Sequence, residues 1–189
     1  MTHPSGTMLR TLLTAIAMLA LAVAVLPARA EGPISSSALV SSALEPALPI
    51  ADRVVVYKGE RKLELLSGGK VLKSYPIALG LRPEGHKEYE GDFRTPEGLY
   101  HLTRRNPNSE YFLSILIDYP HPEDVARARR LGLEPGGAIM IHGQPNVPRK
   151  PLDYYKNVDW TEGCIAVSNS DMVEIWLMTR PDTPIEIRP

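Results

Sequence analysis

The sequence holds one cysteine, few aromatic residues and no surplus of positive charge, and these shortages exclude several classes of protein. Cys164 is the single cysteine among 189 residues, so no intramolecular disulfide stabilises the fold. The formal net charge of −1 leaves no basic surplus for nucleic acid, so no nucleic-acid partner is expected. The histidines show no zinc-ligand spacing, so no metal site is expected either.

Long hydrophobic runs are equally scarce. Only residues 11–26 form one, and they fall short of the ~20 residues that a membrane-spanning helix needs. The run follows Arg10 in an N-terminus without acidic residues. Ala28 and Ala30 then provide small residues at positions −3 and −1 of a cleavage site before Glu31. This layout is typical of a secretory signal peptide over residues 1–30. The alternative is an uncleaved membrane anchor. With the signal removed, the sequence predicts a periplasmic protein without a membrane span.

The rest of the chain divides into a Ser/Ala/Pro-rich lead-in over residues 31–50 and one domain over residues 51–189. Proline is abundant, with 18 residues, which argues against a mostly helical domain. Short β-branched runs between turn residues predict strands instead. The predicted strands cover residues 53–58, 63–66, 71–79, 98–103, 112–117, 138–141 and 185–188. This pattern predicts a mainly β domain with a β-sandwich or barrel-like core.

Two short α-helices are also predicted. The first begins at Pro122, has two acidic residues in its first turn and ends at Gly132. The second covers residues 169–180 and stops before Pro181. One face of the second helix is predicted to pack on the core, through Met172, Ile175, Trp176 and Thr179. The arginines of the first helix are predicted to form a solvated face, made of Arg127, Arg129 and Arg130.

Cys164 and His142 form the candidate catalytic pair. His142 ends a predicted strand and Cys164 follows Gly163 before another apolar run, so only folding can bring the two side chains together. An imidazole beside a thiol takes its proton and makes the sulfur a nucleophile. The N–H groups of Gly163 and Cys164 are expected to face an oxyanion, and Gly163 to admit a substrate carbonyl. The pair alone leaves a second interpretation open, in which Cys164 is a small buried hydrophobic residue.

The residues around this pair match a known motif. His142-Gly143 is followed by a loop and then by Thr161-Glu162-Gly163-Cys164. Upstream, Gly91-Asp92 precedes the stretch from Thr95 to Tyr100, which reads Thr-Pro-Glu-Gly-Leu-Tyr. Both motifs resemble those of the YkuD-type L,D-transpeptidases, and the resemblance runs from about Val54 to the C-terminus.

The resemblance implies a cysteine enzyme of cell-wall biogenesis and cell shape that acts on peptidoglycan stem peptides without a cofactor. Cys164 would be the nucleophile that forms an acyl-enzyme, and His142 its base. The residues expected to shape the site or its oxyanion hole are Gly143, Thr161, Glu162 and Gly163. The site departs from the family pattern at Glu162, where the usual residue is histidine, and at Ala166.

Further segments narrow the resemblance to the YafK branch, namely Arg105-Asn106-Pro107 and Asp118-Tyr119-Pro120. That branch includes a hydrolase that releases a lipoprotein from peptidoglycan, so a lipoprotein is a candidate partner. Three hypotheses follow: an L,D-transpeptidase, an L,D-specific amidase or carboxypeptidase that uses water, and a peptidoglycan-binding module without catalysis.

Aromatic residues in the loop between the base and the nucleophile have two interpretations. Tyr154, Tyr155 and Trp160 would line a peptide groove or act as a lid, or they would pack the loop onto the core. His86 lies in a polar loop and is expected to be exposed.

Overall fold

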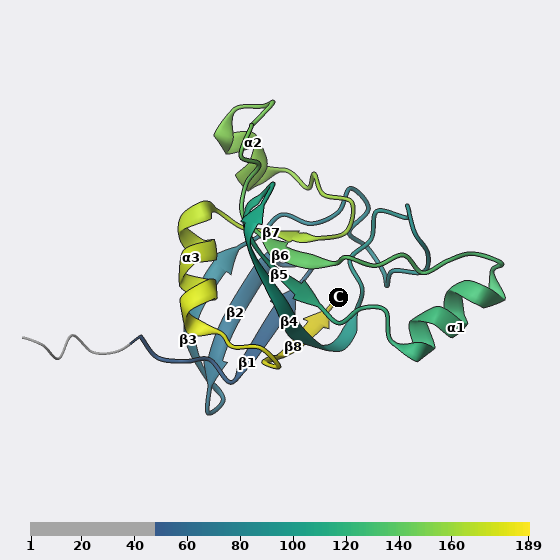
Figure 1. Ribbon diagram of the computed structural model, residues 1–189, viewed down its shortest axis with the longest axis horizontal. Coiled ribbons are helices and arrows are strands. Elements are labelled where there is room, and N and C mark those ends of the chain that lie inside the picture. Colours follow the sequence, from purple (N-terminus) through teal and green to yellow (C-terminus); the bar gives the residue numbers. More distant parts are fainter. Residues whose placement is uncertain (1–47) are drawn as a thin grey trace, which may run out of the picture. The chain divides into compact units, whose positions relative to one another are not determined.

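The computed structural model describes residues 48–189, and its strands form one eight-stranded sheet (Figure 1). The predicted signal peptide and most of the predicted lead-in lie outside the described residues. In chain order the strands are β1 (Arg53–Tyr57), β2 (Lys62–Ser67), β3 (Lys70–Pro76), β4 (Gly98–Ser109), β5 (Phe112–Ile117), β6 (Met140–His142), β7 (Ile165–Ala166) and β8 (Pro184–Arg188). Their order in the sheet is β3-β2-β1-β8-β4-β5-β6-β7. The prediction of a mainly β fold is confirmed.

The sheet curls on itself, which gives the barrel-like core. Strand β4 is twelve residues long, and it pairs with β8 along its first part and with β5 along the rest. Two register shifts in the β4–β5 pair bend it, as bulges do. The segment after β3 then meets β7, where Ala78 and Ala166 exchange two backbone hydrogen bonds of 2.8 Å. The two edge strands of the sheet are thereby connected.

Alternating apolar residues fill the inside of the curl. In β1, Val54 and Val56 are fully buried, and in β8 Ile185 and Ile187 occupy the same face. Period-two alternation of this kind turns one face of each strand inward. Each such side chain contributes about 1.5–3 kcal/mol when removed from water. The core therefore holds the strand register on which the candidate site depends.

Residues 48–189 form three helices, α1 (Pro122–Arg130), α2 (Leu152–Asn157) and α3 (Asn169–Met178), with α1 and α3 at opposite sides in Figure 1. The two predicted helices correspond to α1 and α3. The six-residue α2 has no apolar period that would reveal it in the sequence. None of the helices within residues 48–189 is long and apolar enough to cross a membrane.

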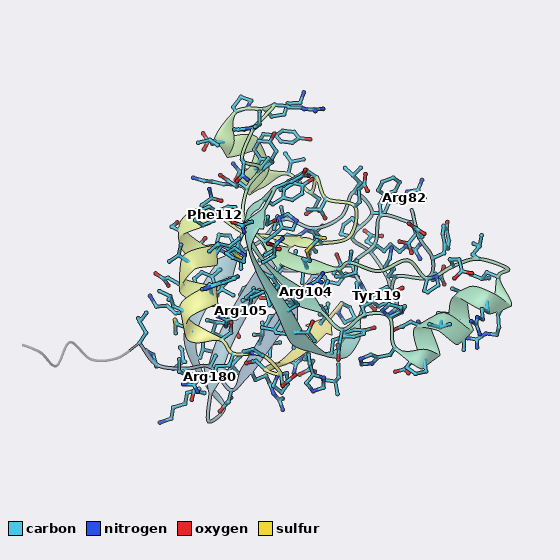
Figure 2. All side chains as sticks on the ribbon, in the orientation of Figure 1. Arg82, Arg104, Arg105, Phe112, Tyr119 and Arg180 are labelled. Carbon is cyan, nitrogen blue, oxygen red and sulfur yellow. The ribbon has the colours of Figure 1, made fainter. Side chains whose placement is uncertain are left out.

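Helix α3 packs on the core as its sequence predicts. The Ser168 side chain accepts a hydrogen bond from the Asp171 N–H at 3.1 Å and caps the helix, and Met172 and Ile175 are fully buried. Arg105, labelled in Figure 2, reaches from β4 to the last turn of the helix. Its guanidinium donates to the Trp176 carbonyl at 2.8 Å and stacks over the indole ring.

Candidate active site

Strands β6 and β7 bring Cys164 and His142 to one face of the sheet. The two strands run parallel, with Ile141 opposite Ile165 and His142 opposite Ala166. Both isoleucines belong to the core. Because side chains alternate along a strand, His142, Ala166 and the preceding Cys164 point to the other face. The sequence separates the candidate base from the candidate nucleophile by a long loop, and the β6–β7 pair brings their two segments together.

The His142 ring is buried in a fixed orientation. Its Nδ1 lies 2.7 Å from the Gly143 carbonyl oxygen, which accepts the Nδ1 proton and leaves Nε2 as the free acceptor. Burial lowers the pKa of His142 to about 4, and the Gly143 carbonyl offsets part of this shift. A Cβ atom on Gly143 would lie 2.5 Å from Asn169 Oδ1, so glycine is required there. At neutral pH the ring is therefore uncharged and ready to accept a proton.

The depressed pKa of His142 predicts a loss of stability in mild acid. The unfolded chain binds a proton near pH 6.5 and the folded chain only near pH 4, so this contribution is complete above pH 6.5 and lost as the pH falls towards 4. The loss amounts to about 3 kcal/mol of unfolding free energy. Urea denaturation between pH 4 and 7.5 measures it. A His142→Gln variant should show a correspondingly smaller decrease, and an unchanged decrease would contradict the assignment.

Two aromatic rings cover His142. The Tyr111 ring centroid lies 4.6 Å from that of His142, and the Trp160 centroid lies 5.6 Å away. Trp160 belongs to the predicted groove residues. Tyr111 was not predicted, because it lies in the turn between β4 and β5, and nothing in the linear sequence connects that turn to His142. Together the two rings restrict access of water to the imidazole.

Cys164 is a half-buried thiol beside the start of β6. Its Sγ donates to the Ala138 carbonyl oxygen at 3.6 Å. Burial raises the pKa of the Cys164 thiol above its ordinary value, and the Glu162 carboxylate adds to this effect. The backbone N–H of Met140 and the Lys87 ammonium act in the opposite direction. The thiol is therefore protonated at neutral pH, and attack through sulfur requires a base.

The influence of Glu162 on the thiol gives a second prediction. Its side chain is exposed, and replacing it with glutamine removes a charge that disfavours the thiolate. We expect Glu162→Gln to lower the pKa of Cys164 and to accelerate alkylation by iodoacetamide at pH 7 about twofold to threefold. The difference should shrink in 1 M salt. Glu123→Gln, on α1, is the matched control and should leave the rate unchanged; an equal acceleration in both variants would refute the prediction.

The turn before Cys164 is held by Thr161. Its hydroxyl donates to the Cys164 carbonyl at 2.7 Å and accepts from the Gly163 N–H at 3.1 Å. This second bond corrects one expectation from the sequence. The Gly163 N–H satisfies a buried hydroxyl inside the turn and does not face a substrate oxyanion.

Gly163 packs closely against the backbone of a neighbouring loop. Its φ is +131°, and a Cβ atom there would lie 2.6 Å from the Arg94 carbonyl oxygen. The Arg94 backbone thus fills the space that a side chain at position 163 would need, and the approach of a substrate carbonyl to Gly163 stays a prediction. The motif glycine fixes the distance between the nucleophile turn and the loop that contains Arg94.

That loop contains a buried ion pair which was not predicted from the sequence. Lys87 Nζ lies 2.8 Å from Asp92 Oδ1, and both side chains are almost fully buried. Asp92 also accepts from the backbone N–H groups of Glu88 at 2.7 Å and of Arg94 at 3.0 Å. These donors keep the pKa of Asp92 below its ordinary value in spite of burial. Asp92 thereby fixes the loop that packs on Gly163.

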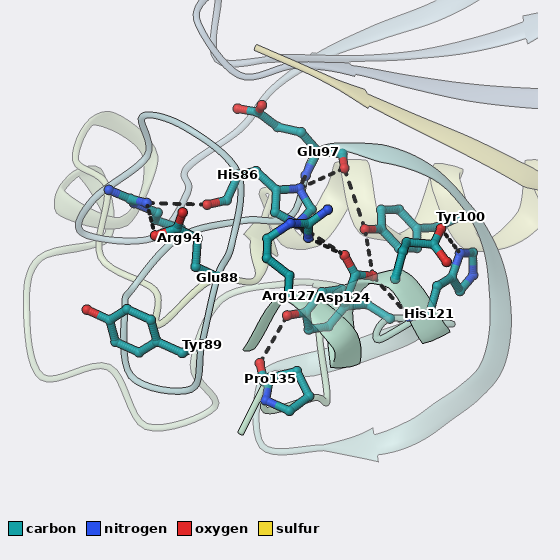
Figure 3. Close-up of polar contacts among 12 residues, drawn as sticks. His86, Glu88, Tyr89, Arg94, Glu97, Tyr100, His121, Asp124, Arg127 and Pro135 are labelled. Atoms are coloured by element: carbon teal, nitrogen blue, oxygen red, sulfur yellow. Dashed lines mark hydrogen bonds and ion pairs between the residues drawn. The ribbon is translucent and has the colours of Figure 1, made fainter. Parts of the chain in front are cut away.

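A polar network anchors the same loop to α1 (Figure 3). His86 Nε2 lies 3.1 Å from Asp124 Oδ1, and Asp124 also accepts from the Tyr100 hydroxyl at 3.1 Å. Arg127 donates to Asp124 at 2.8 Å and contacts His86. The expectations of an exposed His86 and a solvated Arg127 are therefore wrong, because the buried Asp124 carboxylate needs these partners. Within residues 48–189, no three His, Cys, Asp or Glu side chains are grouped to hold a metal ion.

A pocket of about 630 Å³ lies beside the aromatic cover of His142. It is lined by Glu110, Tyr111, Pro145, Asn146, Val147, Arg149, Tyr155 and Trp160. Two of the predicted groove residues, Tyr155 and Trp160, line it, whereas Tyr154 does not and packs edge-on against the Tyr155 ring. The Tyr155 hydroxyl also accepts from the Arg149 N–H at 2.9 Å, so Tyr155 both lines the pocket and fixes its loop.

Comparison with known proteins identifies the family. The family model of the L,D-transpeptidase catalytic domain, YkuD, matches residues 51–187. YafK from Escherichia coli K12 is 35% identical over 96 residues, which cover 48% of this chain and 37% of YafK. The helical cell shape determining protein Pgp2 from Campylobacter jejuni has a similar structure, with a TM-score of 0.54 and 28% identity over 71% of this chain and 46% of Pgp2. This chain thus spans less than half the length of either relative.

The family match includes both motifs and almost all of the described residues, and it agrees with the curled β-sheet and with the resemblance in sequence. The chain therefore belongs to the YkuD family of L,D-transpeptidase catalytic domains.

Proposed function

We propose that this chain is a periplasmic L,D-transpeptidase that modifies peptidoglycan stem peptides through an acyl-enzyme on Cys164. The observation that supports the proposal is the parallel β6–β7 pair, in which His142 lies opposite Ala166, two residues after Cys164. The fixed His142 tautomer adds support, because it leaves Nε2 free to accept a proton. Family membership supports peptidoglycan as the substrate, and the predicted signal peptide supports the periplasm.

The first half of the reaction uses a neutral pair. The Cys164 thiol and the His142 imidazole are both uncharged at neutral pH, so His142 Nε2 takes the thiol proton while sulfur attacks the carbonyl. The attacked carbonyl belongs to the L-centre of the diaminopimelate residue. The new S–C bond forms, the C–N bond to the following D-residue breaks, and His142 returns the proton to the departing amine.

The second half of the reaction decides the class of enzyme. An acceptor amine from a second stem peptide attacks the thioester, loses its proton to His142 and restores the thiol, which gives a cross-link. Water in the same role gives a shortened stem peptide, and a lipoprotein link would be cleaved in the same way. Glu162 favours this second candidate function, because its exposed carboxylate adjoins the nucleophile where it can orient water.

The test is mass spectrometry of products after incubation of the purified protein with a disaccharide-tetrapeptide. A cross-linked dimer supports transpeptidation, whereas a shortened monomer alone would replace it with hydrolysis. Retention on sacculi without either product would instead indicate a binding module and overturn the proposed catalysis.

A further inference from the structure

The pocket beside His142 contains two charges of opposite sign. Glu110 and Arg149 are the charged members of its lining, and both are exposed. Within residues 48–189, the Glu110 carboxylate and the Arg149 guanidinium form no ion pair within 4.0 Å, either with each other or with another side chain. Opposite charges that share a pocket without neutralising each other are available to a ligand that carries both complementary charges.

Hydrogen bonds to the backbone of Glu110 and Arg149 hold these two residues in place. Asn146 fastens the pocket loop to the β4–β5 turn, because its N–H donates to the Glu110 carbonyl at 2.9 Å and its side chain donates to the Ser109 carbonyl at 2.8 Å. On the other side of the pocket, the Tyr155 hydroxyl accepts from the Arg149 N–H at 2.9 Å. The two charges come from distant parts of the sequence, and the pocket between them is formed before any ligand binds.

An aromatic wall connects the pocket to the candidate base. The ring centroids of Tyr155 and Trp160 lie 5.1 Å apart, and those of Trp160 and Tyr111 lie 5.8 Å apart. Tyr111 and Trp160 also contact His142. Tyr111 and Trp160 therefore separate a ligand group in the pocket from the His142 ring. Apolar ring faces suit a methylene chain, and the two charges suit a zwitterionic end group beyond it.

We propose that this pocket binds the zwitterionic end of the diaminopimelate side chain of the donor stem peptide. Arg149 would bind the carboxylate of that end and Glu110 its ammonium. The three methylene groups between the two centres of diaminopimelate would pass along Tyr111 and Trp160, with the L-centre carbonyl at Cys164. The proposal rests on the proposed function, since it names the part of the stem peptide that selects the substrate.

Binding measurements with three synthetic tetrapeptides test each charge separately. One peptide contains diaminopimelate, the second contains lysine, which lacks the carboxylate, and the third contains 2-aminopimelate, which lacks the ammonium. Isothermal titration calorimetry of the full chain with Cys164→Ala measures Kd without turnover. We expect Arg149→Gln to raise the Kd of the diaminopimelate and aminopimelate peptides about tenfold and to leave the Kd of the lysine peptide unchanged. Glu110→Gln should raise the Kd of the diaminopimelate and lysine peptides and leave the Kd of the aminopimelate peptide unchanged.

The matched control is Lys150→Gln, which removes the same charge from the neighbouring residue outside the pocket lining. Equal weakening by Lys150→Gln and Arg149→Gln would overturn the proposal, because it would indicate general attraction of charge. A Glu110→Gln effect of the same size on all three peptides, or no binding at millimolar peptide, would also overturn it. These results are independent of turnover by the chain with Cys164, so failure of this pocket assignment can be distinguished from failure of the proposed function.

Discussion

Replacing Cys164 with alanine is expected to lower the rate of product formation from a disaccharide-tetrapeptide at least about 10³-fold, because the thioester cannot form without the Cys164 sulfur. His142→Gln should cause a loss of similar size, since the neutral thiol then has no base. The double variant should be no worse than either single variant, because the two residues act as a unit.

The control for this prediction is Ser170→Ala, which removes an exposed hydroxyl on α3 and should retain full activity. The readout is the initial rate of dimer or shortened monomer, measured by mass spectrometry. Retention of more than a tenth of the rate by Cys164→Ala would exclude Cys164 as the nucleophile.

Replacing Asp92 with alanine is expected to lower the free energy of unfolding by about 3–5 kcal/mol, because the buried Lys87 ammonium loses its partner. Lys87→Met should lower the free energy of unfolding by less, since Asp92 keeps its backbone N–H donors at Glu88, Tyr89 and Arg94. The loop would lose its anchor on Gly163, so activity should fall with stability in Asp92→Ala.

Urea denaturation at pH 7 measures these differences, and Glu88→Gln serves as the control on the same loop. Its carboxylate is exposed and pairs with Arg94 only at 3.3 Å, so the expected change is below about 1 kcal/mol. A cost for Asp92→Ala no larger than that of Glu88→Gln would refute the role of the buried pair.

The sequence predicts well the features that depend on local pattern. Short β-branched runs between turn residues reveal the strands, and the predicted helix over residues 169–180 corresponds to α3, Asn169–Met178. The family resemblance from the two motifs is confirmed by the family match. These predictions succeed because each depends on neighbouring residues or on a short motif.

Features made by contacts between distant segments could not be predicted. Tyr111 covers His142 from a turn about thirty residues earlier in the chain, and Lys87 is near Cys164 only in the folded protein. The polar loop around His86 gives no sign that Asp124 on α1 binds the ring. The Gly163 N–H was expected to face an oxyanion, and only the folded turn reveals Thr161 as its acceptor.

The most direct test of the central claim is intact-protein mass spectrometry during turnover. Acid quenching after incubation with a disaccharide-tetrapeptide should reveal protein heavier by the donor acyl group, and peptide mapping should locate that group on Cys164. The Cys164→Ala variant should keep its original mass. Product formation by the unsubstituted chain with no adduct on Cys164, or an adduct that persists in Cys164→Ala, would contradict catalysis through a Cys164 acyl-enzyme.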